Sequence, residues 1–136
     1  VYAWVKGGAP GQVVISQAGG ADWLSVDPSQ GKLMTRLMPP AVGRVPPQPL
    51  VSEFVITDGN WHSVGFVWDG SGRILYVDDV EVAKDTQASL AGSTGGLYIG
   101  AGKNLEPGSF FFGLIDDIRI YKQPMNPEDI RNEIHY

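Results

Sequence analysis

Short runs of apolar residues, separated by glycine, proline, aspartate and asparagine, recur along the whole chain. Within the runs, apolar and polar positions alternate or stay apolar over a few residues, a pattern typical of β-strands rather than of amphipathic helices. The pattern predicts strands at Val1–Lys6, Gln12–Gln17, Asp22–Val26, Lys32–Leu37, Val51–Ile56, Trp61–Trp68, Arg73–Val77, Val80–Lys84, Gly96–Gly100 and Phe110–Tyr121.

The strand predicted at Trp61–Trp68 alternates most clearly, because successive side chains of a strand point to opposite faces. One face carries His62, Val64, Phe66 and Trp68, and the other carries Trp61, Ser63, Gly65 and Val67. Because Trp4, Trp61 and Trp68 lie within strand motifs, we expect all three in the core. Trp23 follows a glycine-rich turn, and we expect it nearest the surface.

Two local irregularities are expected from the turn and strand residues. Asp78-Asp79 joins two strands in a two-residue hairpin, where positive φ angles are required and glycine is the usual residue, so we expect strain at Asp79. In the last strand, Ile115 is out of phase with Ile118 and Ile120. A β-bulge at Asp116-Asp117 would bring all three isoleucines to the core.

Proline marks one loop, and capping residues mark one helix. Residues 39–49 hold five prolines, which remove ladder donors and fix φ, so this segment is expected to be an exposed loop. Near the end, Asn126 is a good N-cap and Pro127 suits the first helical position. The sequence therefore predicts a short helix from Asn126 to about Ile134.

Composition supports an all-β domain and excludes two classes of partner. The 136 residues, 43% of them hydrophobic, suffice for one core, and 18 glycines and 10 prolines suit many turns. The net charge of −5 lacks the positive field that nucleic acids require, and no apolar run approaches the ~20 residues of a membrane span. The chain has no cysteine, so disulfides and thiol chemistry are excluded.

Several phrases, in order along the chain, form one family pattern: Trp4 in an early strand, Asp58-Gly59-Asn60-Trp61-His62-Ser63-Val64, Leu75-Tyr76-Val77-Asp78-Asp79-Val80-Glu81-Val82, Leu97-Tyr98-Ile99-Gly100, Gly113–Tyr121 and Pro127-Glu128-Asp129-Ile130. Together they resemble a laminin G-like jelly-roll domain of the concanavalin A-like lectin/glucanase superfamily. The resemblance implies one domain over residues 1–136, an all-β sandwich of two antiparallel sheets with a short C-terminal helix, and one concave and one convex outer surface.

The sequence departs from this family in two places. Asp79 replaces the hairpin glycine, and the strand that usually precedes the one containing Trp4 is missing. Because the chain opens directly on a strand, with no initiator methionine or leader, we expect a fragment of a larger protein. The missing strand would leave a sheet edge or a core face open to upstream residues or to a neighbouring polypeptide.

Catalysis is not expected, although the superfamily contains retaining glucanases. These enzymes need two carboxylates flanking the sugar bond, on one face of one strand. The comparable run here, Asp78-Asp79-Val80-Glu81, straddles a hairpin turn where carboxylates keep ordinary acidity. His62 and His135 lack a recognisable nucleophile, and His62 is expected to pack or hydrogen-bond structurally.

Calcium is the one cofactor that the sequence suggests. Related folds use an aspartate at the position of Asp116, with nearby carbonyls, to bind a structural calcium ion. The other interpretation is that Asp116 caps backbone N–H groups freed by the bulge. Asp22 and Asp27 flank a rim strand and could hold a separate rim calcium ion of the laminin type.

The resemblance and the aromatic residues favour recognition as the function. Trp23, with Asp22 and Asp27, is the candidate ligand contact, and Phe110–Phe112 must turn at least one ring outward. We expect a carbohydrate-binding or adhesion module of an exported, bacterial multidomain protein, extracellular or at the cell surface, that binds a glycan or a surface protein and contacts neighbouring domains. Two alternatives stay open: an assembly domain that binds protein subunits, and an accessory domain of a glycoside hydrolase or sialidase.

Overall fold

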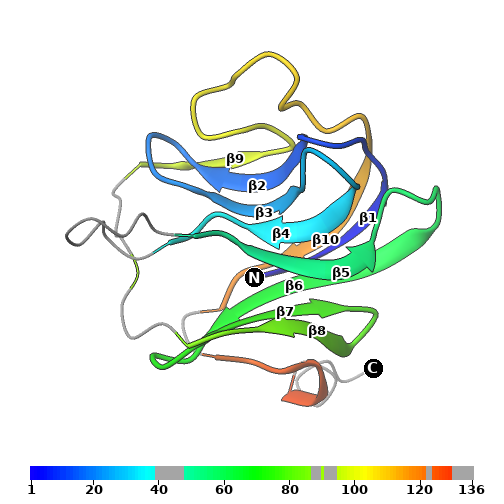
Figure 1. Cartoon of the computed structure of the whole chain (residues 1–136). Coiled ribbons are helices and arrows are strands. Elements are labelled where there is room, and N and C mark those ends of the chain that lie inside the picture. The colour runs from blue at the N-terminus through cyan, green and yellow to red at the C-terminus, as the bar shows by residue number, and fades with distance from the viewer. Residues whose placement is uncertain (39–47, 87–89, 91–94, 122–123, 130–136) are drawn as a thin grey trace.

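The protein folds as two stacked antiparallel β-sheets (Figure 1). The structure is a computed structural model, and it describes residues 1–38, 48–86, 90, 95–121 and 124–129. In this part of the chain the strands are β1 (Tyr2–Gly7), β2 (Val13–Gln17), β3 (Asp22–Val26), β4 (Lys32–Thr35), β5 (Leu50–Val55), β6 (Trp61–Trp68), β7 (Arg73–Val77), β8 (Val80–Lys84), β9 (Leu97–Ile99) and β10 (Gly113–Arg119).

The first sheet has the order β10-β1-β6-β7-β8, and the second has the order β5-β4-β3-β2-β9. Across the sandwich, β3 contacts β6, β4 contacts β7, and β5 contacts both β7 and β8. This stacking places the edge strands β9 and β10 on the same side of the molecule. The predicted all-β, two-sheet sandwich is confirmed.

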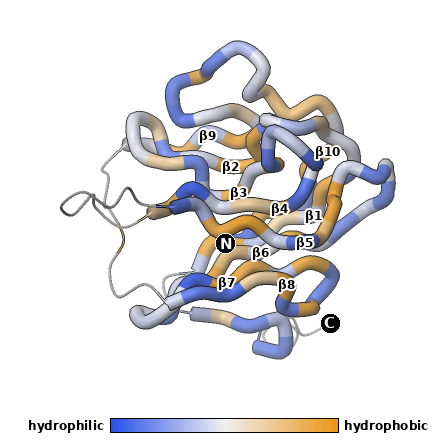
Figure 2. Tube along the Cα trace, in the orientation of Figure 1, coloured by the Kyte–Doolittle hydropathy of each residue, from blue (hydrophilic) through white to orange (hydrophobic). Residues whose placement is uncertain are grey.

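The core lies between the sheets and is built from residues of both. Its buried members are Ala3, Val5, Val14, Ile15, Leu24, Val26, Leu33, Ile56, Val64, Phe66, Leu75 and Val77. Hydrophobic residues are concentrated along the strands of the two sheets (Figure 2). On β6 the inward residues are His62, Val64 and Phe66, as the alternation predicts.

The last strand contains the predicted bulge. Tyr2 pairs with Arg119 while Trp4 pairs with Asp116, so β10 carries one extra residue at this point, where Asp117 has a φ of 50°. As a result Ile115 and Ile118 both pack against the core. The expectation for Ile120 was wrong: β10 ends at Arg119, and Ile120 is 50% exposed.

The β7–β8 hairpin turns through two consecutive left-handed residues, Asp78 with a φ of 51° and Asp79 with a φ of 67°. Two left-handed residues are what a two-residue hairpin of this twist requires. The expected strain at Asp79 is therefore present, because a side chain crowds the backbone in that region.

The C-terminal segment lies along the outer face of the first sheet (Figure 1). The Tyr2 hydroxyl donates a hydrogen bond to the Met125 carbonyl over 2.7 Å, and the Tyr2 ring stacks on Tyr76. The helix begins as predicted: the Asp129 N–H donates to Asn126 Oδ1 over 2.8 Å. Residues 127–129 are helical. The rest of the predicted helix, and residues 39–47 of the predicted proline-rich loop, lie outside the described residues.

None of the described helical segments has the length and apolar character needed to cross a bilayer.

Candidate binding surface

Two tryptophans are exposed on the outer face of the first sheet. Trp4 of β1 is 44% exposed, and Trp61 of β6 is 42% exposed. The expectation that these residues, with Trp68, belong to the core was wrong. Val5 and His62 are the residues that face inward, so the alternation turns their neighbours Trp4 and Trp61 outward.

The register between β1 and β6 places the two tryptophans at nearby positions on neighbouring strands. Trp4 pairs with Ser63 and Lys6 pairs with Trp61, so the two tryptophans are diagonal neighbours on one face. Diagonal neighbours on adjacent strands lie about 7–8 Å apart, within reach of large aromatic side chains. The arrangement forms a two-ring platform, which we call the Trp4–Trp61 face and define by Trp4, Lys6, Trp61, Ser63 and Asp116.

Polar groups with different hydrogen-bonding capacity surround the rings. Lys6 supplies an ammonium donor, Ser63 a hydroxyl, and Asp116, which pairs with Trp4 from β10, a carboxylate acceptor. One oxygen of Asp116 accepts a hydrogen bond from the Asp117 N–H over 2.8 Å. The face therefore combines apolar ring surface with a donor, an acceptor and a hydroxyl that serves as either.

His62 lies directly behind this face and contacts two carboxylates. Its Nδ1 is 2.8 Å from Asp78 Oδ2, and its Nε2 is 2.8 Å from Asp58 Oδ1. The ring is buried and meets Phe54 of the second sheet edge-on. The prediction that His62 bonds structurally is confirmed.

The two aspartates decide the charge of the His62 ring. Burial by itself lowers the pKa of His62, but the hydrogen bonds to Asp78 and Asp58 and their negative charges outweigh it, and the pKa lies above its ordinary value. The pKa of Asp58 is lowered by the hydrogen bond from the Asn60 N–H and by the one from His62. An imidazolium between two carboxylates is the protonation state that this geometry favours.

The structure places the predicted ligand contacts Asp22 and Asp27 at opposite ends of the β3 region, where each accepts backbone hydrogen bonds. Asp27 accepts hydrogen bonds from Ser29, Gln30 and Lys32 in its own turn. Burial would raise the pKa of Asp27, but these bonds hold it at about 2. Asp22 accepts the N–H of Lys103, and burial raises its pKa.

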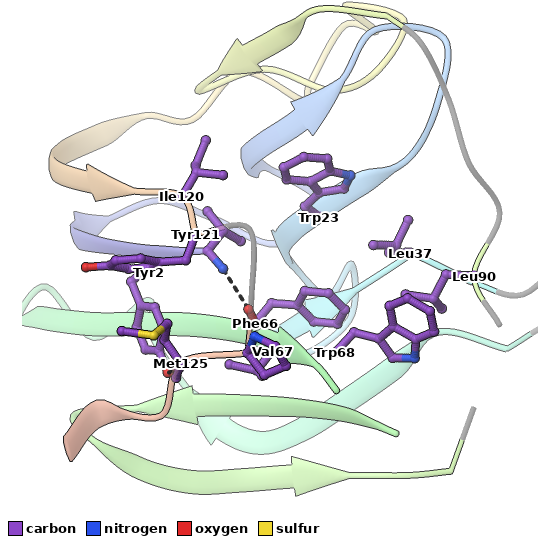
Figure 3. A pocket seen from close by; sticks show the side chains of 12 residues that line it. Tyr2, Trp23, Leu37, Phe66, Val67, Trp68, Leu90, Ile120, Tyr121 and Met125 are labelled. Carbon is purple, nitrogen blue, oxygen red and sulfur yellow. Dashed lines mark hydrogen bonds between the residues drawn. The ribbon is translucent and has the colours of Figure 1, made fainter. Parts of the chain in front are cut away.

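Trp23 lines a mostly apolar cavity of about 250 Å³ at one end of the sandwich (Figure 3). Trp23 lies on one side of this cavity, and Phe66 and Trp68 of β6 lie on the other. Trp23 also packs against the core, so it is less exposed than Trp4 and Trp61. The expectation that Trp23 is the tryptophan nearest the surface was therefore wrong. Its indole N–H is buried and has no acceptor in the described part of the chain.

The three phenylalanines before β10 divide as their alternation predicts. Phe111 packs against the core, whereas Phe110 is 54% exposed and Phe112 is 85% exposed. Further exposed apolar side chains, Leu97, Ile99 and Leu114, come from the edge strands β9 and β10. This side of the sandwich therefore exposes apolar side chains beside the two edge strands.

Comparison with known families agrees with this architecture. Residues 1–131 match the model of the family Laminin_G_3, described as the concanavalin A-like lectin/glucanases superfamily. The chain belongs to this superfamily. A search of curated proteins found no match to the chain.

Calcium is the cofactor that the sequence suggested for this concanavalin A-like domain. Calcium takes six to eight oxygen ligands, often from several carboxylates. Among the residues that the structure describes, no three acidic or histidine side chains gather to hold a metal ion. Asp116 accepts the Asp117 N–H, the contact that the capping interpretation expects, and this hydrogen bond does not decide between the two interpretations. Calcium at Asp116, or at Asp22 and Asp27, stays a prediction.

The residues that sequence reasoning missed are Trp4, Lys6, Trp61 and Ser63. The signal for Trp61 and Ser63 was present, because the alternation of β6 already placed them opposite the inward Val64 and Phe66. What the sequence lacked was the register of β1 against β6, which brings Trp4 and Lys6 to the same place.

Proposed function

We propose that this domain is a non-catalytic recognition module that binds carbohydrate through the Trp4–Trp61 face. The observation that carries the proposal is two tryptophans, each more than 40% exposed, at diagonal positions of neighbouring strands on one sheet face. Exposing this much aromatic surface to water is unfavourable unless the surface serves to bind something.

The chemistry of the face suits an oligosaccharide. The C–H faces of pyranose rings are apolar and stack on indole, while their edges carry hydroxyls that donate and accept hydrogen bonds. Lys6, Ser63 and Asp116 offer matching groups around the rings. Two rings on neighbouring strands suit a ligand of at least two linked sugars, lying across the strands.

Hydrolysis is disfavoured by the partners of the candidate catalytic groups. The carboxylate of Asp78 is occupied by His62 and by the Ser63 N–H. Both ring nitrogens of His62 are engaged by aspartates, so neither is left to act as a base. We therefore infer a binding domain of an exported multidomain protein rather than an enzyme.

Alanine substitution tests the proposal. An array of neutral and acidic oligosaccharides identifies a binder, and calorimetry then gives its affinity for wild type, Trp4→Ala and Trp61→Ala. We expect each substitution to weaken binding by about 30-fold, since a tryptophan at the centre of a binding site contributes about 2 kcal/mol. Trp68→Ala, at the far end of β6, is the matched control and should leave the affinity within about twofold. Retention of full affinity by both face variants would contradict the proposal.

The same titration in EDTA tests calcium. If an ion bound at Asp116 orders the edge of the face, chelation weakens binding and lowers the unfolding midpoint, and Asp116→Asn removes both effects. Identical values with and without EDTA would count against calcium at this position.

An assembly role is the second candidate, favoured by the exposed apolar side chains along β9 and β10, which are edge strands among the described residues. An unpaired strand edge with apolar neighbours can accept an added strand from another polypeptide. In that case no sugar should bind, and a photo-crosslinker at Phe112 in the whole protein should capture a neighbouring subunit that one at Trp4 does not. Leu114→Lys should abolish that capture, because a charge on an edge strand opposes pairing.

A further inference from the structure

The segment that carries Trp61 is held by two carboxylates from two different turns. Asp58, in the turn before β6, accepts the Asn60 N–H over 3.0 Å and contacts His62 Nε2. Asp78, in the β7–β8 turn, accepts the Ser63 N–H over 3.1 Å and contacts His62 Nδ1. Trp61 therefore lies between residues that are each bonded to one or both aspartates.

Only one charge state of His62 satisfies both contacts. A neutral imidazole has one N–H, so it can donate to one aspartate while a ring lone pair faces the other carboxylate. A protonated ring has two N–H groups and donates to both. When His62 loses its second proton, one of its two short hydrogen bonds to an aspartate becomes a repulsive contact between a ring lone pair and a carboxylate. The turn that carries this aspartate is then no longer held by His62.

We propose that His62 is a positioning residue for Trp61: its protonated ring locks the β5–β6 and β7–β8 turns together behind the Trp4–Trp61 face, and deprotonation loosens that face. The inference rests on the proposed function for its effect on ligand binding, but the coupling between His62 and Trp61 is independent of any ligand. Recognition is then strongest at mildly acidic pH and weakens as the pH rises.

Apart from Asp58 and Asp78, the described side chains that face the His62 ring are uncharged. Phe54 of β5 and Val5 of β1 pack near the ring and carry no charge. Their sequence neighbours Glu53 and Lys6 point the other way by alternation, and Glu53 pairs with Lys32. Among the described residues the ring thus titrates against Asp58 and Asp78 alone.

The direction of the pH dependence follows from the raised pKa of His62 in the folded protein. The stabilisation from the protonated ring is fully present below the ordinary pKa of 6.5. It is lost as the pH rises through the higher pKa of the folded state, where the folded protein must release the proton. Folding stability and the position of Trp61 should change over the same pH range.

Nuclear magnetic resonance tests the coupling without a ligand. The His62 ring and the Trp61 indole N–H, assigned with Trp61→Phe, are followed from pH 5 to pH 9. We expect His62 to titrate above 6.5, and the Trp61 signal to shift with the same midpoint. Asp58→Asn and Asp78→Asn should each lower that midpoint, because each removes one negative charge from the ring.

A matched control uses the second histidine of the sequence. His135→Gln should leave the Trp61 titration unchanged, whereas His62→Gln should abolish it. If His62→Gln does not fold, the two aspartate variants still decide the question. A Trp61 signal that stays constant while His62 titrates, or a His62 pKa at or below its ordinary value, would overturn the proposal.

Binding gives the second readout. With an oligosaccharide that binds the wild type, the affinity should fall about tenfold between mildly acidic pH and a pH above the His62 midpoint. An affinity that does not change with pH would contradict the effect on recognition. If no oligosaccharide binds at any pH, the proposed function fails, while the resonance experiment still decides the coupling of His62 to Trp61.

Discussion

At the scale of single residues, the β7–β8 turn combines an unfavourable backbone conformation with a side chain that holds His62. Asp78 and Asp79 both adopt left-handed backbone angles, which glycine adopts without cost. The side chain at Asp78 is nevertheless required, because its carboxylate holds His62 and the Ser63 N–H. The strain at this position is offset by those bonds, as is common where an unusual backbone conformation serves a site.

Asp79→Gly should stabilise the protein. Glycine relieves the left-handed strain at a φ of 67°, and we expect the free energy of unfolding to rise by about 1 kcal/mol, measured by urea denaturation. Gly70→Ala is the control: Gly70 has a φ of 89° and open space around it, so alanine should destabilise by strain alone. A less stable Asp79→Gly protein would show that the aspartate side chain outweighs the backbone strain.

At the scale of elements, one buried arginine ties the β7–β8 hairpin to the second sheet. Arg73, at the start of β7, is 1% exposed and pairs with Asp85, which follows β8. Its guanidinium also donates to the carbonyls of Leu37 and Gln48, each over 3.0 Å. These two carbonyls belong to the connection between β4 and β5, so Arg73 joins the sheets at this end.

Arg73→Met should be severely destabilising. It removes the guanidinium donor from the Asp85 carboxylate and from two carbonyls, and of the donors that residue 73 offers only its backbone N–H still reaches Asp85. Leaving such acceptors without their buried charged donor costs about 3 kcal/mol or more. Urea denaturation measures the loss. Arg119→Gln removes an exposed pair with Asp117 and should change stability by less than about 1 kcal/mol. Equal effects of the two substitutions would mean that Arg73 does not anchor the hairpin.

At the scale of the whole molecule, the charge of −5 constrains what the Trp4–Trp61 face can bind. A negatively charged domain repels long polyanions, whereas stacking on tryptophan is independent of net charge. If the Trp4–Trp61 face binds carbohydrate, as we propose, these two considerations favour a neutral oligosaccharide.

The affinity for such a ligand should hardly depend on salt. Between roughly 0.05 M and 0.5 M sodium chloride we expect the dissociation constant to change by less than about twofold, because screening acts on charged pairs and not on stacking. Calorimetry at the two salt concentrations measures this. A steep loss of affinity with salt would indicate that Lys6 binds an acidic group instead.

The strands, the hairpin turn, the bulge and the helix cap could all be predicted from sequence, because each depends on residues close together in the chain. Alternation identified β6 and put His62 on the same face as Val64 and Phe66, the phase of Ile115 against Ile118 located the bulge, and Asn126 marked the start of the helix. The ordered family motifs added the two-sheet topology, which local patterns alone do not determine.

Only the tertiary structure decided which tryptophans reach the surface and what surrounds His62. The outward faces of β1 and β6 become one platform through the pairing of Trp4 with Ser63, and Asp58 and Asp78 meet at one ring although 20 residues separate them in the chain. Alternation tells that two neighbours face opposite ways, but the packing of the sheets decides which way is inside. That choice depends on long-range burial of apolar surface, which no local pattern encodes.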